Sequence, residues 1–156
     1  MNNNSILRSI RYIFKISDSQ MIHIFSLGGT KVTREDVCNW LKNDHDPSFC
    51  ECSHLQMAAY LSGFIIYKRG AQDGQTRQLE KNLNNNLIFR KLKIALHLHD
   101  QDILTILDSA GVKISKHELS AFFRKKDHKH YRTCKDQILR RFLQGLQLKH
   151  HPSEDL

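Results

Sequence analysis

Cysteine, proline and long apolar runs are scarce in this 156-residue chain, and each scarcity excludes a class of protein. The four cysteines, at positions 38, 50, 52 and 134, are too few and too unevenly spaced for a disulfide framework in a chain of this size. No apolar run approaches the roughly 18 residues that a membrane-spanning helix needs, and the first residues include no signal-type apolar core. We therefore expect a cytoplasmic protein with reduced thiols and no membrane partner.

Catalytic motifs are also missing. The sequence has no glycine-rich phosphate loop, no nucleophile elbow and no pair of carboxylates that helical spacing would bring to one cleft. Asp18 and Asp100 recur in the duplication described below, but each lies at a predicted helix start, where a negative charge is stabilising for local reasons. We predict a non-enzymatic protein without a cofactor.

The remaining composition is that of a helical globular protein. Hydrophobic residues make up 40% and charged residues 26% of the chain. Only Pro47 and Pro152 interrupt apolar residues that are spaced at intervals of three and four, which is typical of helices. The sequence therefore predicts an all-α fold.

The chain contains an ungapped duplication with an offset of 82 residues. Asn2–Asn4 align with Asn84–Asn86, and the same register holds until about position 69. The identities include Arg8 with Arg90, Asp18 with Asp100, Gly29 with Gly111, Cys52 with Cys134 and Gly63 with Gly145. We predict a first repeat at 1–69, a linker at 70–83, a second repeat at 84–150 and a tail at 151–156.

The apolar spacing predicts four helices in each repeat. The first helix is expected near 3–15 and 85–97, and the fourth near 53–67 and 135–149. The second helix should end at Gly29 or Gly111, where a left-handed glycine cap fits. The third should begin at Thr33 or Ser115, each with an acidic residue three positions later that completes a capping box.

The fourth helix has a glycine in its interior in both repeats. Gly63 and Gly145 each cost a helix about 0.5–1 kcal/mol relative to alanine, so their recurrence favours close approach of another helix, with a flexible kink as the alternative. In the first repeat this helix is apolar on additional positions and should be buried on two sides. Its candidate contacts to a protein partner or a second copy are Leu55, Ala59 and Tyr67.

The segments NNLIFRKLKIALHLHDQDILTIL, SKHELSAFFRKKDHKHYRTCKDQ and FLQGLQLK carry a resemblance to a known family. With these segments, the chain resembles the YehS-like family of bacterial proteins. The resemblance covers both repeats and implies a small cytoplasmic protein built from a duplicated domain of unknown function. It implies no activity and assigns no functional residues.

The second and third helices of each repeat have helix-turn-helix spacing, with an apolar residue four and an aromatic residue seven positions after the cap. The turn is longer than in the tight motif, because four residues separate Gly29 from Thr33. Acidic residues at the first repeat's third helix would also repel phosphates. Helix packing alone is therefore the stronger interpretation. The expected exposed positions of this helix are Arg34, Glu35, Asn39 and Lys42, and Lys116, His117, Ala121 and Arg124.

Positive charge is concentrated in the second repeat. Residues 84–156 hold 14 Lys and Arg against 8 Asp and Glu, whereas residues 1–70 hold 8 against 6. Tyr131 could stack on a base, although its counterpart Phe49 favours a core role, and a solvated loop is the alternative for the whole region. The candidate phosphate-binding residues are Lys116, Arg124, Lys125, Lys126, Lys129, Arg132, Lys135, Arg140 and Arg141.

Two clusters of histidine and cysteine suggest metal binding but do not predict it. The first cluster is His45, Cys50, Cys52 and His54, and the second is His128, His130 and Cys134. The spacing matches no common zinc module, and of the first cluster only Cys52 recurs in the second repeat, as Cys134. A small buried thiol before the fourth helix accounts for that cysteine. We expect no metal.

Two functions from different classes remain open. The leading one is an accessory protein that binds DNA, RNA or a nucleic-acid-containing complex through the second repeat. The alternative is a protein-interaction or homodimerisation module that acts through the fourth helix of the first repeat and has no affinity for nucleic acid.

Overall fold

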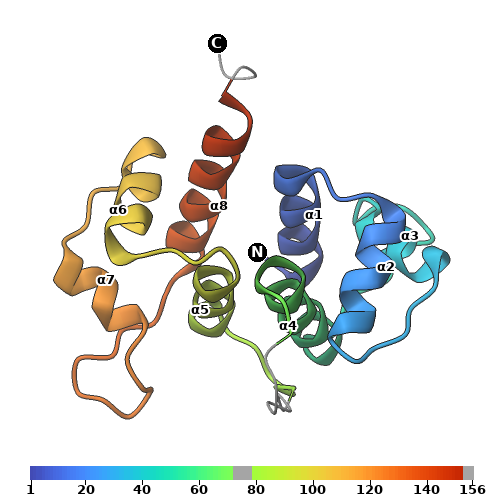
Figure 1. Ribbon diagram of the computed structural model, residues 1–156, viewed down its shortest axis with the longest axis horizontal. Coiled ribbons are helices and arrows are strands. Elements are labelled where there is room, and N and C mark those ends of the chain that lie inside the picture. The colour runs from blue at the N-terminus through green and yellow to red at the C-terminus, as the bar shows by residue number, and fades with distance from the viewer. Residues whose placement is uncertain (72–78, 153–156) are drawn as a thin grey trace. The chain divides into compact units, whose positions relative to one another are not determined.

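The computed structural model describes residues 1–71 and 79–152, which form eight helices and no strand (Figure 1). The predicted all-α fold is therefore confirmed. The chain divides into two compact units, Met1–Leu83 and Asn84–Leu156. The first unit contains α1 (Asn3–Phe14), α2 (Asp18–Leu27), α3 (Arg34–Leu41) and α4 (His54–Arg69). The second unit contains α5 (Asn85–Ala95), α6 (Asp100–Ser109), α7 (Lys116–Phe122) and α8 (Asp136–His150).

The predicted boundaries outside the helices fall partly beyond the described residues. The linker predicted at 70–83 includes positions 72–78, and the tail predicted at 151–156 includes positions 153–156. These positions lie outside the part of the chain that the structure describes.

Side-chain caps begin the helices where the sequence places Asn, Ser or Thr. The Thr33 hydroxyl accepts the Asp36 N–H at 3.0 Å, and Asp36 accepts the Thr33 N–H at 2.9 Å. The matching box at Ser115 and Glu118 has distances of 3.0 and 3.1 Å. Both predicted capping boxes are present, so α3 and α7 begin where the sequence places them.

Glycine ends the second helix of each unit as predicted. Gly29 has a φ of +87° and Gly111 a φ of +86°, a region that side-chain-bearing residues rarely adopt. Thr30 and Val112 then donate their N–H groups back to Phe25 and Leu107 at 3.0 and 2.9 Å. The chain is thereby turned towards α3 and α7.

The interior glycines of α4 and α8 lie where another helix crosses. A Cβ built on Gly63 would be 1.8 Å from the carbonyl oxygen of Ile24 in α2, and one on Gly145 would be 2.2 Å from that of Ile106 in α6. No side chain fits at such distances. The prediction of close helix approach is confirmed for both repeats, and a kink is not needed to explain these glycines.

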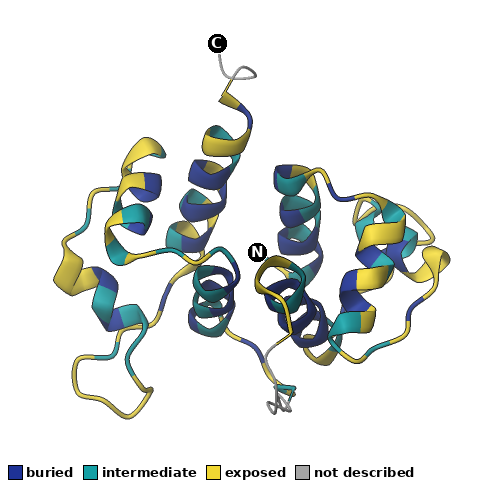
Figure 2. Cartoon of the chain, in the orientation of Figure 1, coloured by how far each residue is buried: buried dark blue, intermediate teal, exposed yellow. Residues whose placement is uncertain are grey.

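Each unit has its own apolar interior, seen as the dark-blue inner faces of the helices in Figure 2. Phe25 and Tyr60 are fully buried with ring centroids 4.9 Å apart in the first unit, and Phe89 and Phe142 are 4.7 Å apart in the second. Helix α4 is buried on most of its circumference between Met57 and Ile65, as its apolar composition predicts.

Candidate functional site

The nine predicted phosphate-binding residues lie on one continuous stretch of the second unit. Lys116 is the first residue of α7, Lys135 is the N-cap of α8, and most of the others lie in the loop between them. In the described part of the chain, none of the nine forms an ion pair with a carboxylate. The exposed members are Lys116, Lys125, Lys126, Lys129, Arg132, Lys135 and Arg140, whereas Arg124 and Arg141 are half-buried.

Three of these residues surround one concavity. Lys129, Arg132 and Lys135 line a depression of about 450 Å³ between α7 and the loop that precedes α8. Helix α7 contributes His117, Glu118 and Ala121 to its opposite wall. We call this depression the basic pocket.

The loop that carries these cations folds back along α7. The Arg132 N–H donates to the carbonyl oxygen of Ala121 at 3.1 Å, and Ala121 is only 6% exposed. The prediction that Ala121 is an exposed position of α7 is therefore wrong. The helix-turn-helix spacing predicts how α6 and α7 are connected, but it does not anticipate that a loop covers part of the exposed helix face.

Asn86 holds this loop in place. The sequence predicts this residue only as part of a helix start. The Asn86 side-chain amide donates to the carbonyl oxygens of Phe122 at 3.0 Å and Arg132 at 2.8 Å. Its carbonyl oxygen accepts the Cys134 N–H at 2.9 Å. These three bonds satisfy a side chain that is 6% exposed, and they tie the backbone at Arg132 and Cys134 to the end of α7.

The first unit repeats this arrangement. Asn4 donates to Trp40 and Cys50 at 2.9 and 2.8 Å and accepts from Cys52 at 3.0 Å. The identity of the two asparagine triplets was the signal for this role, because N-capping explains only the first residue of each. We call the bonds of Asn4 and of Asn86 the asparagine frame, because both units have them. The cations of the basic pocket occur on this frame in the second unit only.

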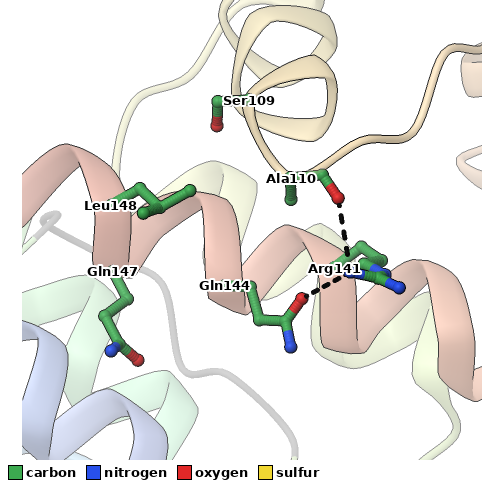
Figure 3. A pocket seen from close by; sticks show the side chains of 6 residues that line it. All are labelled: Ser109, Ala110, Arg141, Gln144, Gln147 and Leu148. Carbon is green, nitrogen blue, oxygen red and sulfur yellow. Dashed lines mark hydrogen bonds between the residues drawn. The ribbon is translucent and has the colours of Figure 1, made fainter. Parts of the chain in front are cut away.

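Arg141 lies apart from the basic pocket, in a second cavity of about 450 Å³ between α8 and the end of α6. Figure 3 shows its guanidinium directed at the carbonyl oxygen of Ala110, 3.5 Å away, and at Gln144, 3.2 Å away. Since a helix C-terminus carries partial negative charge, this contact occupies the arginine locally. Arg140 donates to Gln137 at 3.0 Å and does not line the basic pocket either.

The buried cysteines next to the asparagine frame are inert thiols. Burial raises the pKa of Cys52 and of Cys134 to about 12, so both remain protonated at neutral pH. Within residues 1–71 and 79–152, no three His, Cys, Asp or Glu side chains gather in a way that could hold a metal ion.

The carboxylate nearest the start of α8 has a local partner. The Asn85 amide is 2.8 Å from Asp136 Oδ1 and holds the pKa of that carboxyl below its usual range. Asp136 is therefore engaged by the asparagine triplet at the first turn of α8, directly after Lys135.

The predicted protein-interaction residues have different environments. Leu55 is 49% exposed, and Tyr67 is half-buried with its ring centroid 6.4 Å from that of His23. Ala59 is fully buried, because its backbone lies against Gly28 of α2 so closely that a Cβ there would be 1.8 Å from the Ala59 oxygen. Ala59 is therefore part of the interior of the first unit, and of the three candidate contacts only Leu55 and Tyr67 present surface to a partner.

Comparison with known proteins places the duplication in a family. The family described as "Protein of unknown function (DUF1456)" matches residues 3–70 and again residues 85–151. The chain belongs to this family. It is also 38% identical over 152 residues to the Escherichia coli (strain K12) protein named "Uncharacterized protein YehS", covering 97% of each chain. The predicted resemblance and the tandem duplication are thus confirmed.

No solved structure matches the chain. Among the described residues, no helix has both the length and the apolar character needed to cross a bilayer. Neither the family description nor the name of the relative gives an activity or a ligand, so the chemistry of the site is inferred from its residues.

Proposed function

We propose that this chain is a non-enzymatic cytoplasmic protein that binds nucleic acid through the second unit. The observation that supports the proposal most is the basic pocket, where Lys129, Arg132 and Lys135 line one depression and none of them forms an ion pair with a described carboxylate. Three cations held close together attract a polyanion more strongly than the same charges dispersed over a surface.

The first unit has the same frame without these charges. The residues at the positions equivalent to Lys129, Arg132 and Lys135 are Pro47, Cys50 and Ser53. Because the asparagine bonds are alike in both units, the fold itself does not require cations at these positions. Their presence in the second unit alone favours a binding role over a structural one.

The proposal is tested by fluorescence anisotropy with a labelled oligonucleotide and the full chain. The triple variant Lys129→Glu, Arg132→Glu and Lys135→Glu should weaken binding at least about tenfold, because it removes three phosphate contacts and introduces repulsion. For three contacts on duplex DNA, log affinity should fall with log salt at a slope of about −2.7 in the wild type.

A matched control makes the same charge change in the first unit. The variant Lys31→Glu, Arg34→Glu and Lys68→Glu replaces three exposed cations outside the basic pocket. Its affinity should stay within about threefold of the wild type, because none of these three cations lines the basic pocket and none makes the proposed phosphate contacts. Equal losses in the two triple variants would show that only net charge matters, and this would refute a localised site.

A further inference from the structure

The geometry of the second unit also indicates whether the nucleic acid is single-stranded or duplex. This inference rests on the proposed function. A recognition helix enters the major groove, about 12 Å wide, with its exposed face free. Here α7 has only seven residues, and the loop bonded to Ala121 lies along it. Loop and helix would have to enter the groove together, which disfavours duplex reading by α7.

The basic pocket combines cations with flat rings. His117 on α7 and His130 on the loop have ring centroids 6.2 Å apart with an interplanar angle of 63°. Tyr131 lines the same depression. Base stacking on such rings contributes about 1–3 kcal/mol per base, and it requires a base that is not already stacked and paired inside a duplex.

The size and the rigidity of the pocket suit a single nucleotide. Its volume of about 450 Å³ lies within the usual range of roughly 300–1,000 Å³ for small-ligand sites. The three hydrogen bonds of Asn86 fix the backbone at Arg132 and Cys134 before any ligand arrives, so little ordering entropy is lost there on binding. Glu118 is the one carboxylate among the lining residues, and it already accepts the Ser115 N–H of its capping box.

The first unit provides an internal comparison for the rings as well as for the cations. Glu35 and Ser48 stand at the positions of His117 and His130. The frame is therefore common to both units, while the two imidazole rings and the three cations occur at these positions only in the second unit. The second unit alone has the two kinds of group that an unpaired nucleotide requires.

We propose that the basic pocket accepts one unpaired nucleotide of a single-stranded nucleic acid. Its phosphate contacts Lys129, Arg132 and Lys135, and its base lies against the imidazole rings of His117 and His130. The chain consequently prefers single strands to blunt duplexes of equal length.

The test compares three labelled 20-nucleotide probes, oligo-dT, oligo-U and a blunt DNA duplex, by anisotropy with the full chain at fixed salt. Single strands should bind at least about tenfold more tightly than the duplex. The double variant His117→Ala and His130→Ala should weaken single-strand binding roughly fivefold or more, with less effect on the duplex. Both histidines are exposed, so the variant should keep its circular dichroism spectrum.

The outcomes separate this inference from the function on which it rests. If duplex and single strands bind equally and the Lys129, Arg132 and Lys135 reversal abolishes both, nucleic-acid binding stands and the unpaired-nucleotide site is refuted. If the histidine variant weakens all probes alike, the stacking role is refuted as well. If no probe binds at low salt, both proposals fail. A preference for oligo-U over oligo-dT would identify RNA as the form that the pocket favours.

Discussion

Asn4 and Asn86 show how one side chain determines the course of a long loop. Each is almost fully buried at the start of the first helix of its unit, and each bonds to two carbonyls and one N–H far along the chain. A buried amide without partners would cost several kcal/mol, so the loop is stable only in the path that satisfies it. In the second unit that path brings Arg132 beside α7.

Cys52 and Cys134 lie directly beside these amides, and their raised pKa values give a prediction about pH. Unfolded thiols titrate near 9.0, whereas the folded ones titrate near 12. Below pH 9 both states are protonated, and their contribution to stability is complete. Between about pH 9 and 12 only the unfolded state loses its proton, so the free energy of unfolding should fall as pH rises through that window.

Urea unfolding at pH 8, 9 and 10 measures this effect in the wild type and in the double variant Cys52→Ala and Cys134→Ala. The stability difference between the two proteins should narrow as pH rises, which separates the thiols from the lysines and tyrosines that titrate in the same range. In the native state at pH 8, iodoacetamide should modify exposed Cys50 well before Cys52 and Cys134. Equally fast alkylation of all three would contradict the burial of the thiols.

The helices follow closely from the sequence, because their signals are local. Caps at Thr33 and Ser115, and glycine exits at Gly29 and Gly111, act within one turn of chain and can be recognised from spacing. The basic pocket could not be predicted in this way. It depends on Asn86 reaching Arg132, 46 residues later, and sequence periodicity contains no information about that pairing.

The same limit explains the environments of Ala121 and Ala59, of which Ala121 was predicted to be exposed. Ala121 occupies an outward position of α7, but the folded-back loop covers it. Ala59 is buried because glycine at position 28 lets α2 approach the α4 backbone. In the second unit Ala110 and Arg141 stand at the equivalent positions, and a cavity lies there instead. The two units therefore differ here, with a tight backbone contact in the first and a cavity in the second.

Adding a methyl group at the crossing glycines should destabilise one unit at a time. Gly63→Ala places a Cβ against the Ile24 carbonyl and Gly145→Ala against that of Ile106. The clash should outweigh the gain of up to about 1 kcal/mol in helix propensity, with a net loss of about 1–3 kcal/mol. Lys149→Ala, at an exposed site on α8, should change stability by less than about 0.5 kcal/mol.

Trp40 makes this prediction measurable for each unit separately. It is the one tryptophan of the chain and lies buried in the first unit, so its fluorescence follows the unfolding of that unit, while circular dichroism follows both. Gly63→Ala should shift the fluorescence transition to lower urea. Gly145→Ala should shift only the dichroism. A fluorescence shift of equal size in both variants would mean that the units unfold together.

At the scale of the whole molecule, a duplicated frame has acquired charge in one copy. Residues 84–156 have 14 Lys and Arg against 8 Asp and Glu, whereas residues 1–83 have 10 against 8. Both copies keep the asparagine frame, the capping boxes and the glycine crossing. The units therefore differ in the side chains that are placed on that frame. If the second unit alone binds nucleic acid, the binding function should remain with that unit when the chain is divided.

Expressing the two units as separate fragments tests that separation. Because each unit has its own interior, residues 1–83 and 84–156 should both give helical circular dichroism spectra, although cores of this size provide little net stability and low temperature is advisable. Fragment 84–156 should bind the single-stranded probes within about fivefold of the full chain, since it contains the whole basic pocket. Fragment 1–83 should not bind at the same salt, because Glu35 and Glu51 stand at the positions of His117 and Thr133 on its frame and repel phosphates. An unfolded 84–156 fragment would contradict the independence of the units. Binding by a folded 1–83 fragment would show that the shared frame, rather than the added cations, contacts the nucleic acid.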